Sequence, residues 1–82
     1  MSGFERRHVW HPYAAMRDPA PVHRVVGAEG VWLTLQDGRR MIDAMSSWWA
    51  VAHGHRHPRL VAAMQDQLAR LPHVMFGGLT HD

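Results

Sequence analysis

The stretch VWLTLQDGRRMIDAM, residues 31–45, decides the fold. Its first five residues carry β-branched and aromatic side chains, which favour a strand. Asp37-Gly38 follows, and such a pair is typical of a hairpin turn because glycine tolerates positive φ. Residues 40–45 can return as another strand, and residues 23–26 can supply a third, joined through a turn at Glu29-Gly30. The pattern predicts a three-stranded antiparallel meander.

A helix is predicted after this meander. Residues 46–57, SSWWAVAHGHRH, are interpreted as a loop. Pro58 can then open a helix, because an N–H in the first helical turn would have no partner within the helix. Apolar side chains recur with helical spacing through about Leu71, and Pro72 ends the helix. These side chains are Leu60, Val61, Met64, Leu68 and Leu71.

The two ends of the chain have no obvious partner in this scheme. Residues 1–22 hold three of the five prolines and no sustained apolar period, so we expect an extended arm that packs on something else. Residues 73–82, HVMFGGLTHD, form an apolar tail whose glycine pair, Gly77-Gly78, is expected to turn. One sheet and one helix could pack together and still leave both ends uncovered. The sequence therefore predicts an α+β fragment of a larger protein.

Composition excludes several functional classes. The 82 residues are 46% hydrophobic and 20% charged, which is typical of a globular chain. All nine basic residues are arginines, scattered without the dense stripe that nucleic-acid binding needs, and the absence of cysteine excludes a disulfide framework. No apolar run approaches the roughly 20 residues that span a bilayer, and the start lacks a signal-peptide pattern. We expect a cytoplasmic protein that binds neither nucleic acid nor membrane.

Three histidines alternate in the loop, at positions 53, 55 and 57, and imidazoles are common metal ligands. Gly54 and Pro58 favour a loop over a strand, and neither a carboxylate nor a cysteine stands nearby in the sequence to complete a ligand set. We therefore predict no metal site. His57 is instead a candidate cap for the helix.

The other polar residues around the loop have simple interpretations. Ser46 and Ser47 lack the sequence context of a nucleophile and are expected to satisfy backbone groups. Arg39, Arg40 and Asp43 are interpreted as solvated residues of the turn and the strand surface.

Several motifs, in their order and spacing, resemble the start of the class III aminotransferases. The strand, the Asp-Gly turn and the return strand are typical of that superfamily. The remaining motifs are similar to its biotin-pathway group, the adenosylmethionine–8-amino-7-oxononanoate aminotransferases. The resemblance runs from about His8 to His81. Its motifs are His11-Pro12-Tyr13; Asp37-Gly38-Arg39-Arg40 with Asp43; Met45-Ser46-Ser47-Trp48-Trp49; His53-Gly54 and His57-Pro58; and His73-Val74-Met75-Phe76-Gly77-Gly78 with Thr80-His81.

The resemblance implies a type I pyridoxal-phosphate-dependent transferase fold in a homodimer, with active sites at the subunit interface. Residues 23–72 would be the N-terminal part of a small domain, and residues 73–82 would begin the connection to a large domain that binds pyridoxal 5'-phosphate. The full enzyme would move the amino group of S-adenosylmethionine to 8-amino-7-oxononanoate, giving 7,8-diaminononanoate.

Two aromatic residues are candidates for substrate binding. Without the resemblance, Tyr13 is an arm anchor, and Trp48 and Trp49 cover a core. The resemblance implies that Tyr13 helps recognise the oxononanoate and stacks on the adenine of S-adenosylmethionine. It implies that Trp48 forms a rigid wall against the substrate, whereas Trp49 packs.

Lysine is absent from these 82 residues, although the reaction needs one to form a Schiff base with the cofactor. No βαβ unit or phosphate-binding glycine loop is visible either. We therefore predict no catalytic and no cofactor-binding residue in this chain, and no activity for the chain alone. Two alternatives stay open: a fragment of a class III aminotransferase with another amino donor, and a non-catalytic binding module that folds alone.

Overall fold

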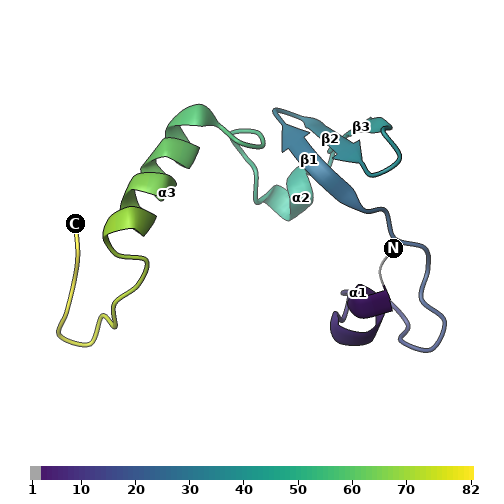
Figure 1. Cartoon of the computed structure of the whole chain (residues 1–82), viewed down its shortest axis with the longest axis horizontal. Helices are drawn as coiled ribbons and strands as arrows, with labels where there is room; N and C mark the ends of the chain where they lie inside the picture. Colours follow the sequence, from purple (N-terminus) through teal and green to yellow (C-terminus); the bar gives the residue numbers. More distant parts are fainter. Residues whose placement is uncertain (1–2) are drawn as a thin grey trace.

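The computed structural model describes residues 3–82, and its three-stranded antiparallel sheet lies at the upper right of Figure 1, on the side of the N-terminus. Strands β1 (Val25–Glu29), β2 (Trp32–Leu35) and β3 (Arg40–Ile42) pair in the order β1-β2-β3. The predicted meander is therefore confirmed. Strand β3 ends earlier than expected, because the Asp43 carbonyl accepts from the Ser46 N–H (3.1 Å) and the chain turns away there.

Trp32 is the first residue of the central strand and pairs with Glu29 at the end of β1 and with Ile42 at the end of β3. The Arg40 guanidinium lies 4.6 Å from the centroid of the Trp32 ring, which is within the range of a cation–π contact. The expected hairpin turn joins β2 to β3, with Gly38 at φ 89°. Only glycine adopts this angle without strain, so the Asp-Gly signal in the sequence is accounted for.

Helix α3 (Pro58–Arg70) also follows the prediction. The His57 side chain caps it by accepting from the Arg59 N–H at 3.3 Å. A short helix, α1 (Gly3–His8), was not predicted, so the arm is not extended throughout. The Phe4 and His8 rings stack at 4.2 Å, and this contact between residues four apart supports the short helix ahead of the first proline, Pro12.

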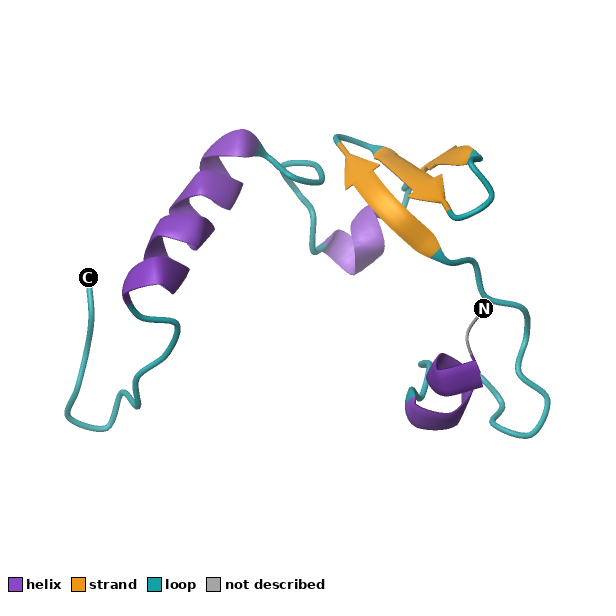
Figure 2. Ribbon diagram, viewed as in Figure 1, coloured by secondary structure: helices purple, strands orange, loops and turns teal. Residues whose placement is uncertain are grey.

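The elements do not close around a common core. Helix α3 lies away from the sheet (Figure 2), and across residues 3–82 it packs against no other helix or strand. Within the same residues Leu35 is the one buried side chain. The radius of gyration is 16.9 Å, against about 12 Å for a compact domain of this length. The expected packing of helix on sheet is therefore absent from the described residues.

Large apolar side chains remain exposed along α3 and beyond it. Leu60, Met64 and Leu68 expose 46%, 66% and 62% of their surface, and Phe76 exposes 65%. Surfaces of this kind are normally covered by another part of a protein. No helix within residues 3–82 is both long enough and apolar enough to cross a membrane.

Candidate functional site

A left-handed turn forms the centre of the candidate site. The four residues of α2 (Ser46–Trp49) all have positive φ, at 49°, 45°, 65° and 69°. Left-handed backbone costs a residue with a side chain roughly 1–2 kcal/mol, so four in succession need support from their surroundings. The sequence predicted an irregular loop here and gave no sign of this conformation.

The support comes from Asp43, four residues before Ser47. The Ser47 N–H donates to Asp43 Oδ1 at 3.0 Å, and the Ser47 hydroxyl donates to Asp43 Oδ2 at 2.7 Å. The Asp43 side chain is only 10% exposed, so its interpretation as a solvated strand residue was wrong. The expectation that Ser47 would bond to backbone groups was also wrong, because its hydroxyl bonds to a carboxylate.

His55 completes this network and ties it to the sheet. Its Nε2 lies 2.8 Å from Asp43 Oδ2, and because a carboxylate can only accept, the imidazole N–H donates. The backbone of His55 exchanges two hydrogen bonds with Gly30, at 2.8 and 3.0 Å. The Asp43 N–H donates to the Val31 carbonyl at 2.8 Å, so Asp43 and His55 are both fixed to the turn between β1 and β2.

These contacts change the acid–base properties of Asp43. The Ser47 hydroxyl, the Ser47 N–H and the His55 imidazole lower the pKa of the Asp43 carboxyl from 3.8 to about 2. The carboxylate is therefore ionised at neutral pH and acts as a permanent acceptor. A similar but exposed arrangement lies in the hairpin turn, where the Arg39 N–H and guanidinium lower the pKa of Asp37.

Tyr13 and Trp48 meet beside this turn. Their ring centroids are 5.7 Å apart at an interplanar angle of 87°, an edge-to-face arrangement that aromatic pairs favour. Tyr13 also has positive φ, at 54°, so both aromatic rings project from left-handed backbone. Bulky residues in this conformation are rare, and strained backbone of this kind clusters at functional sites.

The two rings border a hollow of about 400 Å³, and most of its lining is apolar. Within the described residues Tyr13 is 95% exposed and Trp48 is 61% exposed, so no part of this chain covers either ring fully. The structure thus brings together the two residues that the sequence singled out for substrate binding. The residues around the hollow are Pro12, Tyr13, Asp43, Met45, Ser47 and Trp48.

Trp49 and the histidine run differ from what the sequence suggested. Trp49 was expected to pack, but its side chain is 89% exposed within the described residues. A carboxylate does lie beside the histidines in space, since Asp43 contacts His55. Even so, no group of three or more potential ligands gathers anywhere in residues 3–82. The imidazole rings of His53 and His57 lie edge to face, with their centroids 6.3 Å apart.

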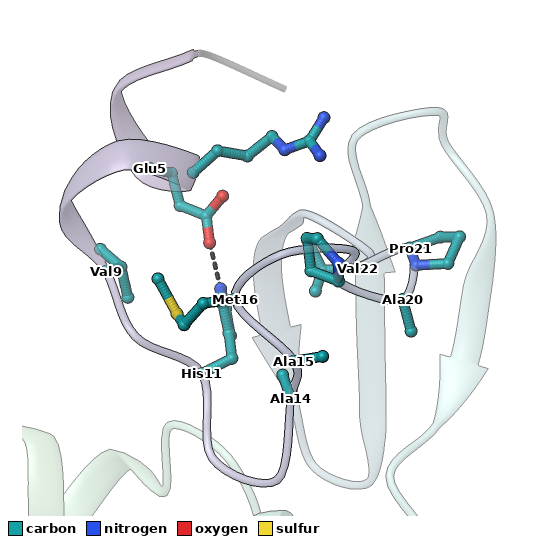
Figure 3. A pocket seen from close by; sticks show the side chains of 11 residues that line it. Glu5, Val9, His11, Ala14, Ala15, Met16, Ala20, Pro21 and Val22 are labelled. Carbon is teal, nitrogen blue, oxygen red and sulfur yellow. Dashed lines mark hydrogen bonds and ion pairs between the residues drawn. The ribbon is translucent and has the colours of Figure 1, made fainter.

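A separate hollow of about 280 Å³ lies within the N-terminal arm (Figure 3). Alanine, proline, valine and methionine side chains form most of its wall, and an ion pair between Glu5 and His11 spans one side. Neither Tyr13 nor Trp48 lines it. Its walls come from α1 and the proline-rich segment alone, so it reflects how the arm folds on itself.

Comparison with known proteins assigns the family. Residues 13–82 match the class-III aminotransferase family. The chain belongs to the class III aminotransferases. This agrees with the strand, turn and return-strand motifs in the sequence.

Three curated relatives of this family member carry the same name. The chain is 57% identical to an adenosylmethionine-8-amino-7-oxononanoate aminotransferase of Corynebacterium glutamicum, and 50% identical to one of Buchnera aphidicola. It is 42% identical to a protein of the same name in Saccharomyces cerevisiae. Each match covers 95% of this chain but only 17–18% of the relative. The chain therefore spans less than a fifth of the length of these proteins.

Solved structures agree with the fold. The crystal structure of an adenosylmethionine-8-amino-7-oxononanoate aminotransferase from Methanocaldococcus jannaschii matches with a TM-score of 0.85, covering 96% of this chain and 18% of that one. A transaminase from the marine bacterium Virgibacillus matches with a TM-score of 0.79 over 96% of this chain and 19% of its own. Both are 25% identical to this chain. The open arrangement of sheet, loop and helix is thus the one that these segments adopt inside complete aminotransferases.

Proposed function

We propose that this chain forms one wall of the substrate pocket in an aminotransferase that transfers the amino group of S-adenosylmethionine to 8-amino-7-oxononanoate. The product is 7,8-diaminononanoate, and the pathway is biotin biosynthesis. The edge-to-face pair of Tyr13 and Trp48 beside an apolar hollow carries the proposal. An apolar wall suits the aliphatic chain of the oxononanoate, and an exposed aromatic face suits the adenine of S-adenosylmethionine.

Pyridoxal 5'-phosphate is the cofactor that membership of this family implies. It supplies the electron sink for amino transfer. The residues of this chain do not fit a covalent role toward it, because the 82 residues include no lysine and arginine does not form a Schiff base. We assign the cofactor and the catalytic lysine to the remainder of a longer protein, and we propose that this protein is a cytoplasmic homodimer.

A different class III transaminase is the alternative. The fold alone favours neither choice strongly, since the Virgibacillus transaminase and the Methanocaldococcus enzyme are equally identical to this chain, at 25%. The curated relatives at 42–57% identity favour the biotin-pathway enzyme. We extend their activity to this chain on that ground.

A chimera tests the proposal. In it, this chain replaces the aligned 79-residue segment of the Corynebacterium glutamicum relative. We expect the chimera to form 7,8-diaminononanoate from the two substrates. Trp48→Ala should raise the KM for 8-amino-7-oxononanoate roughly ten- to hundredfold, the equivalent of losing one buried apolar side chain. The exposed Trp10 (81%) does not line the hollow, so Trp10→Ala is the matched control and should leave that KM unchanged.

The role of Tyr13 divides between its ring and its hydroxyl. Tyr13→Phe keeps the ring edge against Trp48 and removes only the polar contact, so it should weaken binding less than Tyr13→Ala does. A chimera that uses other amino donors but not S-adenosylmethionine would support the alternative. Equal KM values in the parent and in Trp48→Ala would contradict a substrate wall.

A further inference from the structure

Asp43 lines the same hollow as the two aromatic rings and holds the backbone that presents one of them, Trp48. Its carboxylate accepts from the Ser47 N–H, the Ser47 hydroxyl and His55, and Ser47 immediately precedes Trp48. The side chains of Asp43 and His55 are 10% and 15% exposed, so water competes little for these hydrogen bonds. The carboxylate is therefore placed to fix the direction in which the Trp48 ring points.

The turn needs such an anchor because its conformation is intrinsically unfavourable. Ser47 (φ 45°, ψ 48°) and Trp48 (φ 65°, ψ 45°) are both left-handed, and neither is glycine. Within the turn, the Met45 carbonyl accepts from the N–H groups of Trp48 (3.1 Å) and Trp49 (3.4 Å). Without the anchor these residues would relax toward right-handed backbone, and the Trp48 ring would leave Tyr13.

We propose that Asp43, with Ser47 and His55, is a positioning residue. It acts on the substrate through Trp48, by fixing the orientation of the Trp48 ring in the pocket wall. The chemistry it selects for is a long aliphatic amino-acceptor that lies in the hollow against the touching rings of Trp48 and Tyr13. The inference rests on the proposed function, and it goes further by assigning a positioning role to a residue whose carboxylate is occupied by hydrogen bonds from Ser47 and His55.

The test uses the chimera and a double-mutant cycle. Asp43→Ala should raise the KM for 8-amino-7-oxononanoate on the order of tenfold, because small misplacements of a positioning group have effects of that size or more. kcat with saturating substrate should change much less. In a chimera already carrying Trp48→Ala, Asp43→Ala should add almost nothing, because its effect passes through the Trp48 ring. Additive effects of the two changes would overturn the proposal.

A rescue variant separates positioning from a general loss of structure. Ser47→Gly removes the strain of positive φ at that position, so it should restore part of the lost affinity in the Asp43→Ala background. The matched control is Asp37→Asn, a carboxylate that also bonds to a neighbouring backbone N–H but lies in the hairpin turn, outside the hollow. It should leave the KM unchanged. A loss that Ser47→Gly leaves intact, or one shared by Asp37→Asn, would overturn the proposal.

The outcomes also separate this inference from the proposed function. If Trp48→Ala raises the KM and Asp43→Ala does not, the substrate wall stands and the positioning role fails. If the parent chimera forms no 7,8-diaminononanoate, or if Trp48→Ala has no effect, the proposed function itself fails.

Discussion

Residues 1–82 alone should not hold the structure described above. Only Leu35 is buried among residues 3–82, and the apolar faces of α3, Trp49 and Phe76 are open to solvent. Burial of apolar surface is the main favourable term in folding, and here most of it depends on surfaces outside the described chain. The perturbation is simply to express the 82 residues without any other part of an aminotransferase.

The radius of gyration gives the size of the expected effect. The structure has a value of 16.9 Å, whereas a compact domain of this length would have about 12 Å and an unfolded chain about 28 Å. We expect small-angle scattering behind size-exclusion chromatography to give either aggregates or a monomer near the unfolded value. Near-UV circular dichroism from the four tryptophans should be weak, because no fixed core surrounds them.

Two results would refute this reasoning. A single species near 12 Å with strong near-UV signal would mean that the chain closes around its own core and folds alone. A species near 17 Å with the same signal would mean that the open arrangement is rigid without cover. Either result would favour the binding-module alternative and would prompt a ligand screen around Tyr13 and Trp48. The intact chimera, measured in parallel, should keep its near-UV signal and so serve as the control.

Two further predictions concern the loop in the chimera. The pKa of Asp43 is lowered from 3.8 to about 2, so its contacts stabilise the fold fully above pH 3.8 and are lost as the pH falls toward 2. The difference in urea midpoint between the parent and Asp43→Asn should therefore shrink as the pH falls from about 4 toward 2; a difference that grows over that range would contradict the assigned contacts. Gly54→Ala should destabilise the loop by about 1–2 kcal/mol, because Gly54 has φ 80° and an added Cβ would lie 3.3 Å from the Gly30 backbone. Gly27→Ala meets no atom within 4 Å, so equal urea midpoints for the two alanine variants would contradict this explanation.

The sheet and α3 could be predicted because local signals there agree with one another. A β-branched and aromatic run, an Asp-Gly turn and a proline at the first helical position each point to the element that forms. The edges were less predictable. Helix α1 is supported by a ring contact between Phe4 and His8, within an arm that otherwise has little helical signal. The prolines later in the arm led to the prediction of an extended segment, so this helix was missed.

The proposed substrate-binding pair was predicted from sequence only through the resemblance. Tyr13 and Trp48 stand 35 positions apart, and nothing in composition or periodicity indicates that their rings meet. Asp43 was missed for a different reason. It stands at the end of an exposed strand, where a carboxylate is normally solvated, and its partners Ser47 and His55 were interpreted one at a time.

The left-handed turn shows why interpretation residue by residue fails at this site. Serine and tryptophan do not favour positive φ, so every local preference at residues 46–49 argues against the conformation that forms. A spacing of four residues from Asp43 to Ser47 carries no special meaning until the turn is left-handed and brings the Ser47 N–H and hydroxyl onto one carboxylate. The two features depend on each other. The Asp43 hydrogen bonds stabilise the left-handed turn, and the turn places Ser47 over the Asp43 carboxylate and so reduces its exposure. The backbone preferences of residues 46–49 are overridden at the point where the Tyr13 and Trp48 rings meet. Because strained backbone clusters at functional sites, we propose the substrate wall at these two rings and not at the larger apolar face of α3.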